Sequence, residues 1–377
     1  MSHKAGVDFF KSKRDWSLRK DLILSKYLRP YLTKIATQGR PVLIVDGFAG
    51  PGKFDDDKPG SPLIICEVVR GLRAQSAKGS YKVWLVEQDP KLFDQLKANT
   101  NQFRDFMTAH NVTFGEVLTE IEKAVSEYNV FLYLDPFTVT GLAWNALDRI
   151  FQQVNHRQSV ECLINFNVCA LARAACVSLG KNFKDQIEDD IMVGESASTI
   201  ATVNESLGGD WWREPFCAAQ SFPKACELLT QGYIKKLRER FAEVCSHEIK
   251  ERHAHAVPKY VLVFGSRHPD ALELMNDAMA QSLELQARTE APSQPTLFET
   301  RSTTLVPDQS DLDSSILLLG KNEQSRGDLI MSVIRNHFGM YTRPTIRSRI
   351  KTLLTLRKMK SRSGKLRIND DEMIKTI

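Results

Sequence analysis

The sequence of 377 residues lacks the features of several special classes of protein. No stretch approaches the ~18 consecutive apolar residues that a transmembrane helix needs. The first twenty residues have no apolar core of the secretory type, so we expect no signal peptide. The seven cysteines include no CxxC pair, which argues against a disulfide framework or a zinc finger and favours a reducing cytoplasmic location.

What is present is the composition of a globular protein with an uneven charge distribution. Hydrophobic residues make up 42% of the chain and charged residues 26%, close to globular averages. Residues 1–35 contain nine Lys/Arg and three Asp/Glu, and residues 340–377 contain eleven and three. The segment between them is acidic, since the net charge is only +5. Basic ends are typical of a protein that meets a polyanion, although a merely solvated surface would give the same counts.

Apolar and amphipathic segments alternate along most of the chain. Residues 16–32 have the apolar spacing of a helix. Five strands separated by helices are expected at residues 41–48, 81–88, 111–117, 129–137 and 161–168. Strands that are apolar throughout and alternate with helices form a parallel sheet covered on both faces. The pattern therefore predicts an α/β fold with a Rossmann-like sheet.

The rest of the chain divides into an insert, a sheet edge, a linker and a basic tail. Residues at about 170–225 are expected to form a mostly helical insert, and two late strands within 247–268 to pair as an antiparallel edge. Residues 286–311 are polar, contain three prolines and read as a linker. Two helices and a basic hairpin then outline a winged helix-turn-helix. We expect an α/β domain at 1–285 and a small basic domain at 312–377.

The strongest motif is VDGFAGPG, which follows the first predicted strand. It places Asp46 at the strand end and Phe48, Gly50 and Gly52 in the loop. Glycines let a loop turn sharply and let a ligand approach the backbone. Glu87 ends the second predicted strand, where an acidic side chain can accept hydrogen bonds from both hydroxyls of a ribose. Together these residues predict an adenosine-binding site.

The spacing of this loop distinguishes two cofactors. A dinucleotide fingerprint reads G-x-G-x-x-G, and its helix starts within the loop, where the helix N-terminus holds a pyrophosphate. Here the pattern is F-x-G-x-G, and the helix is expected to begin about ten residues later with Ser61 as its N-cap. That pattern resembles the nucleoside pocket of class I S-adenosylmethionine-dependent methyltransferases. We therefore favour S-adenosylmethionine over NAD.

A third motif, LDPF, ends the fourth predicted strand. Ligands sit at the carboxyl edge of such sheets, so Asp135, Pro136 and Phe137 are the candidate catalytic residues. The motif resembles the D/N-P-P-Y/F of amino methyltransferases, in which a carboxylate or amide and a carbonyl accept hydrogen bonds from the target amino group. This chain has one proline where those enzymes have two. A simple Asp-Pro turn remains the alternative.

Other clusters carry weaker hypotheses. His253 and His255 would share one face of a strand but have no third ligand nearby in the sequence, so we predict no metal site. Trp211 and Trp212 could form a base-stacking platform, and packing within the insert is the favoured alternative.

The basic tail carries cations on a predicted helix and on the predicted hairpin. Phosphate contacts need cations on one face and apolar residues on the other. A dimerisation module with solvated cations, or phosphate binding by the basic segment from Lys4 to Lys34, are the alternatives. The candidate nucleic-acid-binding residues are Arg343, Arg347, Lys351, Lys358, Lys360, Arg362, Lys365 and Arg367.

Taken together, the chain resembles the bacterial three-Cys-motif partner protein family (TcmP). The matching segments are 16–28, 45–52, 60–63, 134–137, 208–212, 260–269 and the C-terminal winged-helix-like segment. The resemblance implies a class I methyltransferase-like fold and a partner protein that bears a three-cysteine motif, whereas this chain has no CxxxCxxC. The glycine loop followed by GSP is also similar to large-subunit rRNA adenine-N6 methyltransferases, which carry DPPY where this chain has DPF.

These observations lead to one functional hypothesis and two alternatives. The hypothesis is an S-adenosylmethionine-dependent methyltransferase that acts on DNA or RNA and works with the three-Cys-motif partner. The first alternative is a non-catalytic protein that binds nucleic acid or a partner and keeps a nucleoside pocket. The second is a methyltransferase whose acceptor is a protein.

Overall fold

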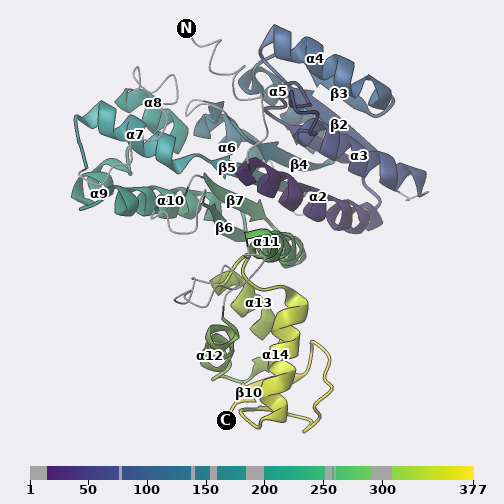
Figure 1. Ribbon diagram of the computed structural model, residues 1–377, viewed down its shortest axis with the longest axis vertical. Helices are drawn as coiled ribbons and strands as arrows, with labels where there is room; N and C mark the ends of the chain where they lie inside the picture. Colours follow the sequence, from purple (N-terminus) through teal and green to yellow (C-terminus); the bar gives the residue numbers. More distant parts are fainter. Residues whose placement is uncertain are drawn as a thin grey trace. The chain divides into compact units, whose positions relative to one another are not determined.

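The computed structural model describes residues 15–75, 79–136, 141–152, 159–183, 199–250, 257–258, 260–290 and 308–377. The chain forms two compact units, Met1–His268 and Pro269–Ile377 (Figure 1). Helix α11 (Pro269–Glu290) belongs to the second unit, whereas the sequence predicts a first domain that extends to residue 285.

A seven-stranded sheet forms the centre of the first unit. Its strand order is β3-β2-β1-β4-β5-β7-β6. Strands β1 to β5 are parallel, and β7 is antiparallel to both of its neighbours, β5 and β6. This mixed α/β sheet is consistent with the Rossmann-like methyltransferase fold that the sequence predicts. Its strands are β1 (Val42–Asp46), β2 (Tyr81–Val86), β3 (Met107–His110), β4 (Asn129–Leu134), β5 (Val160–Phe166), β6 (Glu243–Ile249) and β7 (Tyr260–Ser266).

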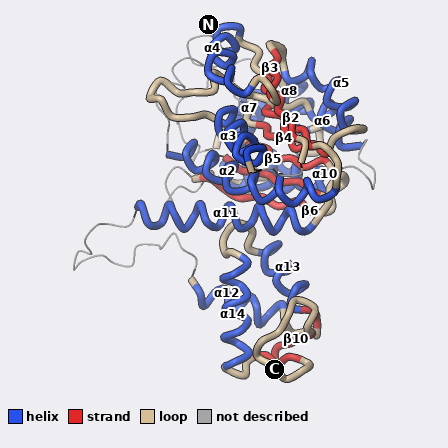
Figure 2. Tube along the Cα trace, turned by 90° about the vertical axis from the view of Figure 1, so that its right-hand side faces the viewer, coloured by secondary structure: helices blue, strands red, loops and turns tan. Residues whose placement is uncertain are grey.

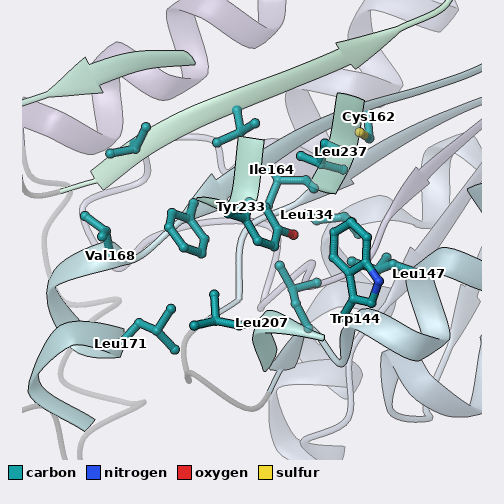
Figure 3. Close-up of a cluster of buried hydrophobic side chains, with 14 of the residues drawn as sticks. Leu134, Trp144, Leu147, Cys162, Ile164, Val168, Leu171, Leu207, Tyr233 and Leu237 are labelled. Atoms are coloured by element: carbon teal, nitrogen blue, oxygen red, sulfur yellow. The ribbon is translucent and has the colours of Figure 1, made fainter. Parts of the chain in front are cut away.

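Helices cover both faces of this sheet (Figure 2). On one face the aromatic ring of Tyr27 packs on Phe131 of β4 and Phe264 of β7. On the other face a continuous apolar core joins the sheet to the later helices, and Figure 3 shows Trp144, Leu171 and Tyr233 within it. The helical elements of this unit are α2 (Asp15–Ile35), η1 (Ala36–Gln38), α3 (Ser61–Ala74), α4 (Pro90–Thr100), η2 (Asn101–Phe103), α5 (Phe114–Val125), α6 (Trp144–Gln152), α7 (Val168–Leu179), α8 (Ile200–Leu207), α9 (Arg213–Ala218) and α10 (Phe222–Arg238).

The third strand lies earlier in the chain than the sequence analysis predicts. Residues 111–117 were expected to be a strand, but β3 ends at His110 and α5 begins at Phe114. The reason is a capping box, in which the Thr113 side chain accepts from the Glu116 backbone and the Glu116 carboxylate accepts from the Thr113 backbone. This local pairing starts a helix in a segment whose apolar residues alone resemble a strand.

The second unit has its own helices and a small sheet. Helices α12, α13 and α14 pack together through Leu312, Ile316, Leu329, Val333 and Leu353, all of which are buried. An antiparallel sheet of order β8-β10-β9 completes the unit. Besides α11, its elements are α12 (Gln309–Leu319), β8 (Gln324–Ser325), α13 (Arg326–Asn336), α14 (Arg343–Thr355), β9 (Met359–Ser361) and β10 (Met373–Thr376).

Two expectations for this unit are corrected. Helix α12 begins at Gln309, inside the stretch that was read as a linker, because the Asp308 side chain caps it and Leu312 and Ile316 provide a buried face. The prediction of a basic hairpin at 358–368 is also wrong, since β9 pairs with β10 and not with the residues that follow Gly364. The long loop between β9 and β10 takes the place of the expected tight turn.

Candidate functional site at the carboxyl edge of the sheet

The glycine loop after β1 is held in place by neighbouring strands. Gly47 donates its backbone N–H to Tyr133 of β4, and Ala49 donates to Val86 of β2. Gly50 and Gly52 adopt φ values of 61° and 80°, which belong to the left-handed region and favour glycine. The loop is therefore a fixed structure at the carboxyl edge of β1, as the motif predicts.

Glu87 ties this loop to the end of β2. One of its carboxylate oxygens accepts from the Gly50 backbone at 2.9 Å, and the other accepts from the Asp89 backbone at 2.7 Å. Burial raises the pKa of Glu87, and these two backbone donors act in the opposite direction. Because a carboxylate oxygen can accept more than one hydrogen bond, Glu87 retains acceptor capacity for a ligand.

Asp46 is the most perturbed carboxyl of the site. Its side chain is fully buried, and Oδ1 accepts from the Phe48 backbone at 3.2 Å. Oδ2 has no hydrogen-bond partner among the residues that the structure describes. Burial is the main cause that raises the pKa of Asp46 to about 7. The nearby carboxylates of Asp135 and Asp21 act in the same direction, and the hydrogen bonds from Ser61 and Phe48 act against it. A buried carboxyl that lacks a counterion is a mark of a ligand site.

Asp135 occupies the carboxyl end of β4 but has two tight internal partners. Lys20 of α2 pairs with its Oδ2 at 2.5 Å, and Asn165 of β5 donates from Nδ2 to its Oδ1 at 2.5 Å. Lys20 and Asn165 are both almost completely buried. Asp135 is thus anchored by neighbours on two elements. Pro136 follows it and is buried, while Phe137 lies outside the described residues.

A small cavity adjoins the ends of β4 and β5. Its volume is about 30 Å³, and Pro136, Leu142, Asn165 and Tyr233 are among the residues that line it. That volume is enough for about one water molecule or one group of similar size. The cavity is therefore mostly apolar, and its polar lining residues are Asn165, Asn167 and Ser206.

The structure brings Asp46, Glu87 and Asp135 to one edge of the sheet. Asp46 ends β1, Glu87 and Asp135 directly follow β2 and β4, and these strands are adjacent in the order β2-β1-β4. Sequence reasoning missed Lys20 and Asn165, which belong to the same cluster. A signal existed for both, since each is a polar residue in a segment that is mostly apolar and buried.

The basic residues of the second unit fall into two groups. Arg343 and Arg347 both pair with Asp370, and Arg343 also pairs with Glu273. Arg362 pairs with Glu323. All three are partly neutralised by carboxylates of the same unit. Arg343 and Arg347 are also half-buried, contrary to the expectation that they point freely outward, whereas Arg362 is exposed. The remaining predicted cations are exposed: Lys351, Lys358, Lys360, Lys365 and Arg367.

A groove lies between α14 and the loop that precedes β10. Its volume is about 660 Å³. Lys351 and Arg367 line it together with apolar side chains that include Leu354 and Leu366. The ion pairs of Asp370 with Arg326 and Arg343 hold the loop against the helices. The groove thus combines exposed cations with an apolar floor.

The weaker sequence hypotheses are resolved in part. Trp212 is buried and donates to Asn204, and Trp211 donates to the Leu207 carbonyl, so both pack within the insert. All seven cysteines are free thiols. His253 and His255 lie outside the described residues. Within the part of the chain that the structure describes, no cluster of side chains could hold a metal ion, and no helix has the length and apolar character needed to span a membrane.

Comparison with known proteins gives matches only at the level of solved structures. No family model and no curated protein matches the sequence. A protein of Legionella pneumophila has 10% identity and a TM-score of 0.37, over 67% of this chain and 88% of the other. The plantazolicin methyltransferase BamL, solved with a desmethylplantazolicin analogue and S-adenosylhomocysteine, has 10% identity and a TM-score of 0.30, over 71% and 91%.

A third structural match is longer than this chain. It is WbdD, with 15% identity and a TM-score of 0.32 over 68% of this chain, and the match spans only 42% of WbdD. With identities this low, what the chain binds has to be argued from its own residues.

Proposed function

We propose that the chain is an S-adenosylmethionine-dependent methyltransferase that acts on nucleic acid. The observation that carries the proposal is the buried Asp46 carboxyl, whose Oδ2 has no partner among the described residues, beside a glycine loop clamped by Glu87. A cationic amino group of a ligand would supply the missing partner of Asp46. The spare acceptor capacity of Glu87 suits the hydroxyls of a ribose. Both groups occur in S-adenosylmethionine.

The residues present fit this cofactor better than a dinucleotide. A pyrophosphate needs free backbone N–H groups at a helix N-terminus close to the glycines. The N-terminus of α3 lies beside Gly52, but Gly60 donates its N–H to the Gly52 carbonyl at 2.9 Å, and Pro62 has no N–H to offer. The acidic side chains near the loop, Asp46, Glu87 and Asp135, would also repel a second phosphate group. When bound, S-adenosylmethionine supplies an electrophilic methyl group. The chain's residues hold the cofactor and position an acceptor at Asp135, Pro136 and Phe137.

Nucleic acid as the acceptor is supported by the second unit. From α12 onward its order of elements, helix–strand–helix–helix–strand–strand, is compatible with a winged helix, in which α14 would be the recognition helix and the loop between β9 and β10 the wing. The exposed cations Lys351, Lys358, Lys360, Lys365 and Arg367 lie on this helix and near this loop. They would contact phosphates, while Arg343, Arg347 and Arg362 would mainly brace the unit.

The proposal also includes the family of the chain and a protein partner. The segments that resemble the three-Cys-motif partner family include the glycine loop and LDPF, and the glycine loop and Asp135 lie at the same edge of the sheet. We propose that a partner protein with a three-cysteine motif acts together with this chain. The seven unpaired thiols fit a reducing cytoplasm.

One observation favours a non-catalytic alternative. Both oxygens of Asp135 are engaged by Lys20 and Asn165, so this carboxylate is less available to a substrate than the sequence analysis assumed. A protein that uses the pocket only to sense a nucleoside would tolerate that arrangement.

Titration calorimetry tests the proposal. The protein should bind S-adenosylmethionine and S-adenosylhomocysteine but not NAD. Co-expression with nucleic acid and the three-Cys partner, followed by mass spectrometry, should then show a methyl mass increment on nucleic acid. If the protein binds S-adenosylmethionine but no methyl mass increment appears, the non-catalytic alternative is correct. If the increment appears on a protein, the methyl acceptor is a protein.

A further inference from the structure

Three polar side chains are linked through Asp135 at the ends of β4 and β5. Lys20 pairs with one oxygen of Asp135, and Asn165 donates to the other. Asn165 is only 1% exposed. Of these three residues, Asn165 is the one that lines the small cavity.

The orientation of the Asn165 amide follows from this pairing. A carboxylate that pairs with a lysine ammonium accepts hydrogen bonds and donates none. The Asn165 group that faces Asp135 must therefore be its NH₂, and its carbonyl oxygen must face away. Exchanging the two would place two acceptors against each other. The Lys20–Asp135 pair thus fixes the orientation of the Asn165 amide, with its carbonyl oxygen directed away from Asp135.

The carbonyl oxygen of Asn165 is an unsatisfied hydrogen-bond acceptor within the described structure. It is buried and has no hydrogen-bond partner among the described residues. An unsatisfied buried acceptor costs about 1–3 kcal/mol, and such groups in native proteins are few. The adjoining cavity holds one group about the size of a water molecule, and its lining includes Leu142 and Tyr233 as well as the polar residues Asn167 and Ser206.

We propose that Asn165 accepts a hydrogen bond from the exocyclic amino group of the nucleobase that receives the methyl group, and that Lys20 and Asp135 are its positioning residues. The inference rests on the proposed function and moves the recognition of the acceptor from Asp135 to Asn165. An amino group matches the cavity in size. Its N–H can donate a hydrogen bond to the Asn165 carbonyl oxygen, whereas a carbonyl or phosphate oxygen of a ligand would place a second acceptor against it.

The test compares amino and oxo bases. Short single-stranded oligodeoxynucleotides of adenine and of hypoxanthine, which carries an oxygen in place of the amino group, are titrated into full-length protein saturated with S-adenosylhomocysteine. The same comparison uses cytosine and uracil. Phosphate contacts are equal within each pair, so the ratio of affinities reports the amino group alone. We expect the amino base to bind about tenfold more tightly in at least one pair.

Two variants and a control locate the effect. Asn165→Leu should abolish the preference. Asp135→Asn frees the Asn165 amide to turn its NH₂ outward, so it should also abolish or reverse the preference while leaving S-adenosylhomocysteine affinity nearly unchanged. The matched control is Asn129→Leu. Asn129 is also fully buried, but it begins β4 and so lies at the opposite edge of the sheet from Asn165, which is near the end of β5. It should keep the preference.

The outcomes separate the two proposals. Equal binding of amino and oxo bases in the wild type, or a preference that survives Asn165→Leu, overturns the role of Asn165 while S-adenosylhomocysteine binding upholds the cofactor site. Absence of S-adenosylhomocysteine binding overturns the proposed function, and the comparison of bases is then made without it. A variant that fails to fold is identified by its thermal melt, and Asp135→Asn and Asn165→Leu serve as independent tests.

Discussion

Replacing Asp46 with asparagine should stabilise the protein and weaken cofactor binding at the same time. Burial raises the pKa of Asp46 from 3.8 to about 7. Each pKa unit corresponds to about 1.4 kcal/mol, so above pH 7 the ionised carboxyl costs the folded state about 4 kcal/mol. The asparagine side chain would avoid this cost but would leave one buried amide N–H without a partner, at about 1–3 kcal/mol. The net gain at pH 8 is about 1–3 kcal/mol.

The sign of the pH dependence follows from the direction of the shift. A carboxyl whose pKa is raised on folding favours the folded state at low pH, and its contribution falls as pH rises from about 4 to 7. The stability advantage of Asp46→Asn should therefore be about 2–3 kcal/mol larger at pH 8 than at pH 5. In a unit of this size the advantage at pH 8 appears as a rise of a few degrees in Tm.

Glu161→Gln is the matched control. Glu161 lies fully buried in β5, where burial raises its pKa to about 7, but it bonds to Tyr27 and Ser266 and lies outside the cofactor site. In thermal melts, both variants should gain stability relative to the wild type as pH rises. Only Asp46→Asn should lower S-adenosylhomocysteine affinity, by about tenfold or more. The reasoning fails if Asp46→Asn shows no pH-dependent stabilisation, or if both variants bind the ligand equally well.

Three further predictions concern pH, salt and the second unit. S-adenosylhomocysteine affinity of the wild type should fall as pH drops through about 7, because Asp46 must lose its proton to pair with the ligand's amino group; a flat profile in calorimetry would contradict this role. Replacing Lys351, Lys358, Lys360, Lys365 and Arg367 together with Gln should reduce the log–log salt slope of duplex binding by about four units, and an unchanged slope would point to the N-terminal basic segment. Asp370→Ala, which leaves Arg326, Arg343 and Arg347 without their shared partner, should destabilise the second unit by about 1–3 kcal/mol in denaturant titrations; no change would show that these pairs are solvent-screened.

Local sequence signals predicted the elements that carry the proposed cofactor site. The apolar strands ending in Asp46 and Glu87, and the glycines between them, are read directly from composition and spacing. Their meeting at one edge follows from the parallel sheet alone. For the same reason the Asp135 position could be placed at this edge without knowing any side-chain contact.

What the sequence did not reveal depends on contacts between distant residues. Lys20 lies 115 residues before its partner Asp135, and Asn165 lies 30 residues after it. Likewise, the neutralisation of Arg343 and Arg347 depends on Asp370, which only the folded unit brings close. The helix beginning at Gln309 was missed because a polar first turn hid its two buried apolar residues.

The most direct test of the central claim is calorimetric titration of S-adenosylhomocysteine into the wild type and two glycine variants. Gly50→Val places a branched side chain in the loop at φ 61°, and Gly180→Val imposes the same backbone strain at φ 63°, where an added Cβ would meet no atom within 4 Å. The account predicts binding by the wild type and by Gly180→Val, and none by Gly50→Val. A wild type that binds NAD but not S-adenosylhomocysteine, or a Gly50→Val variant that binds it normally, would contradict the account.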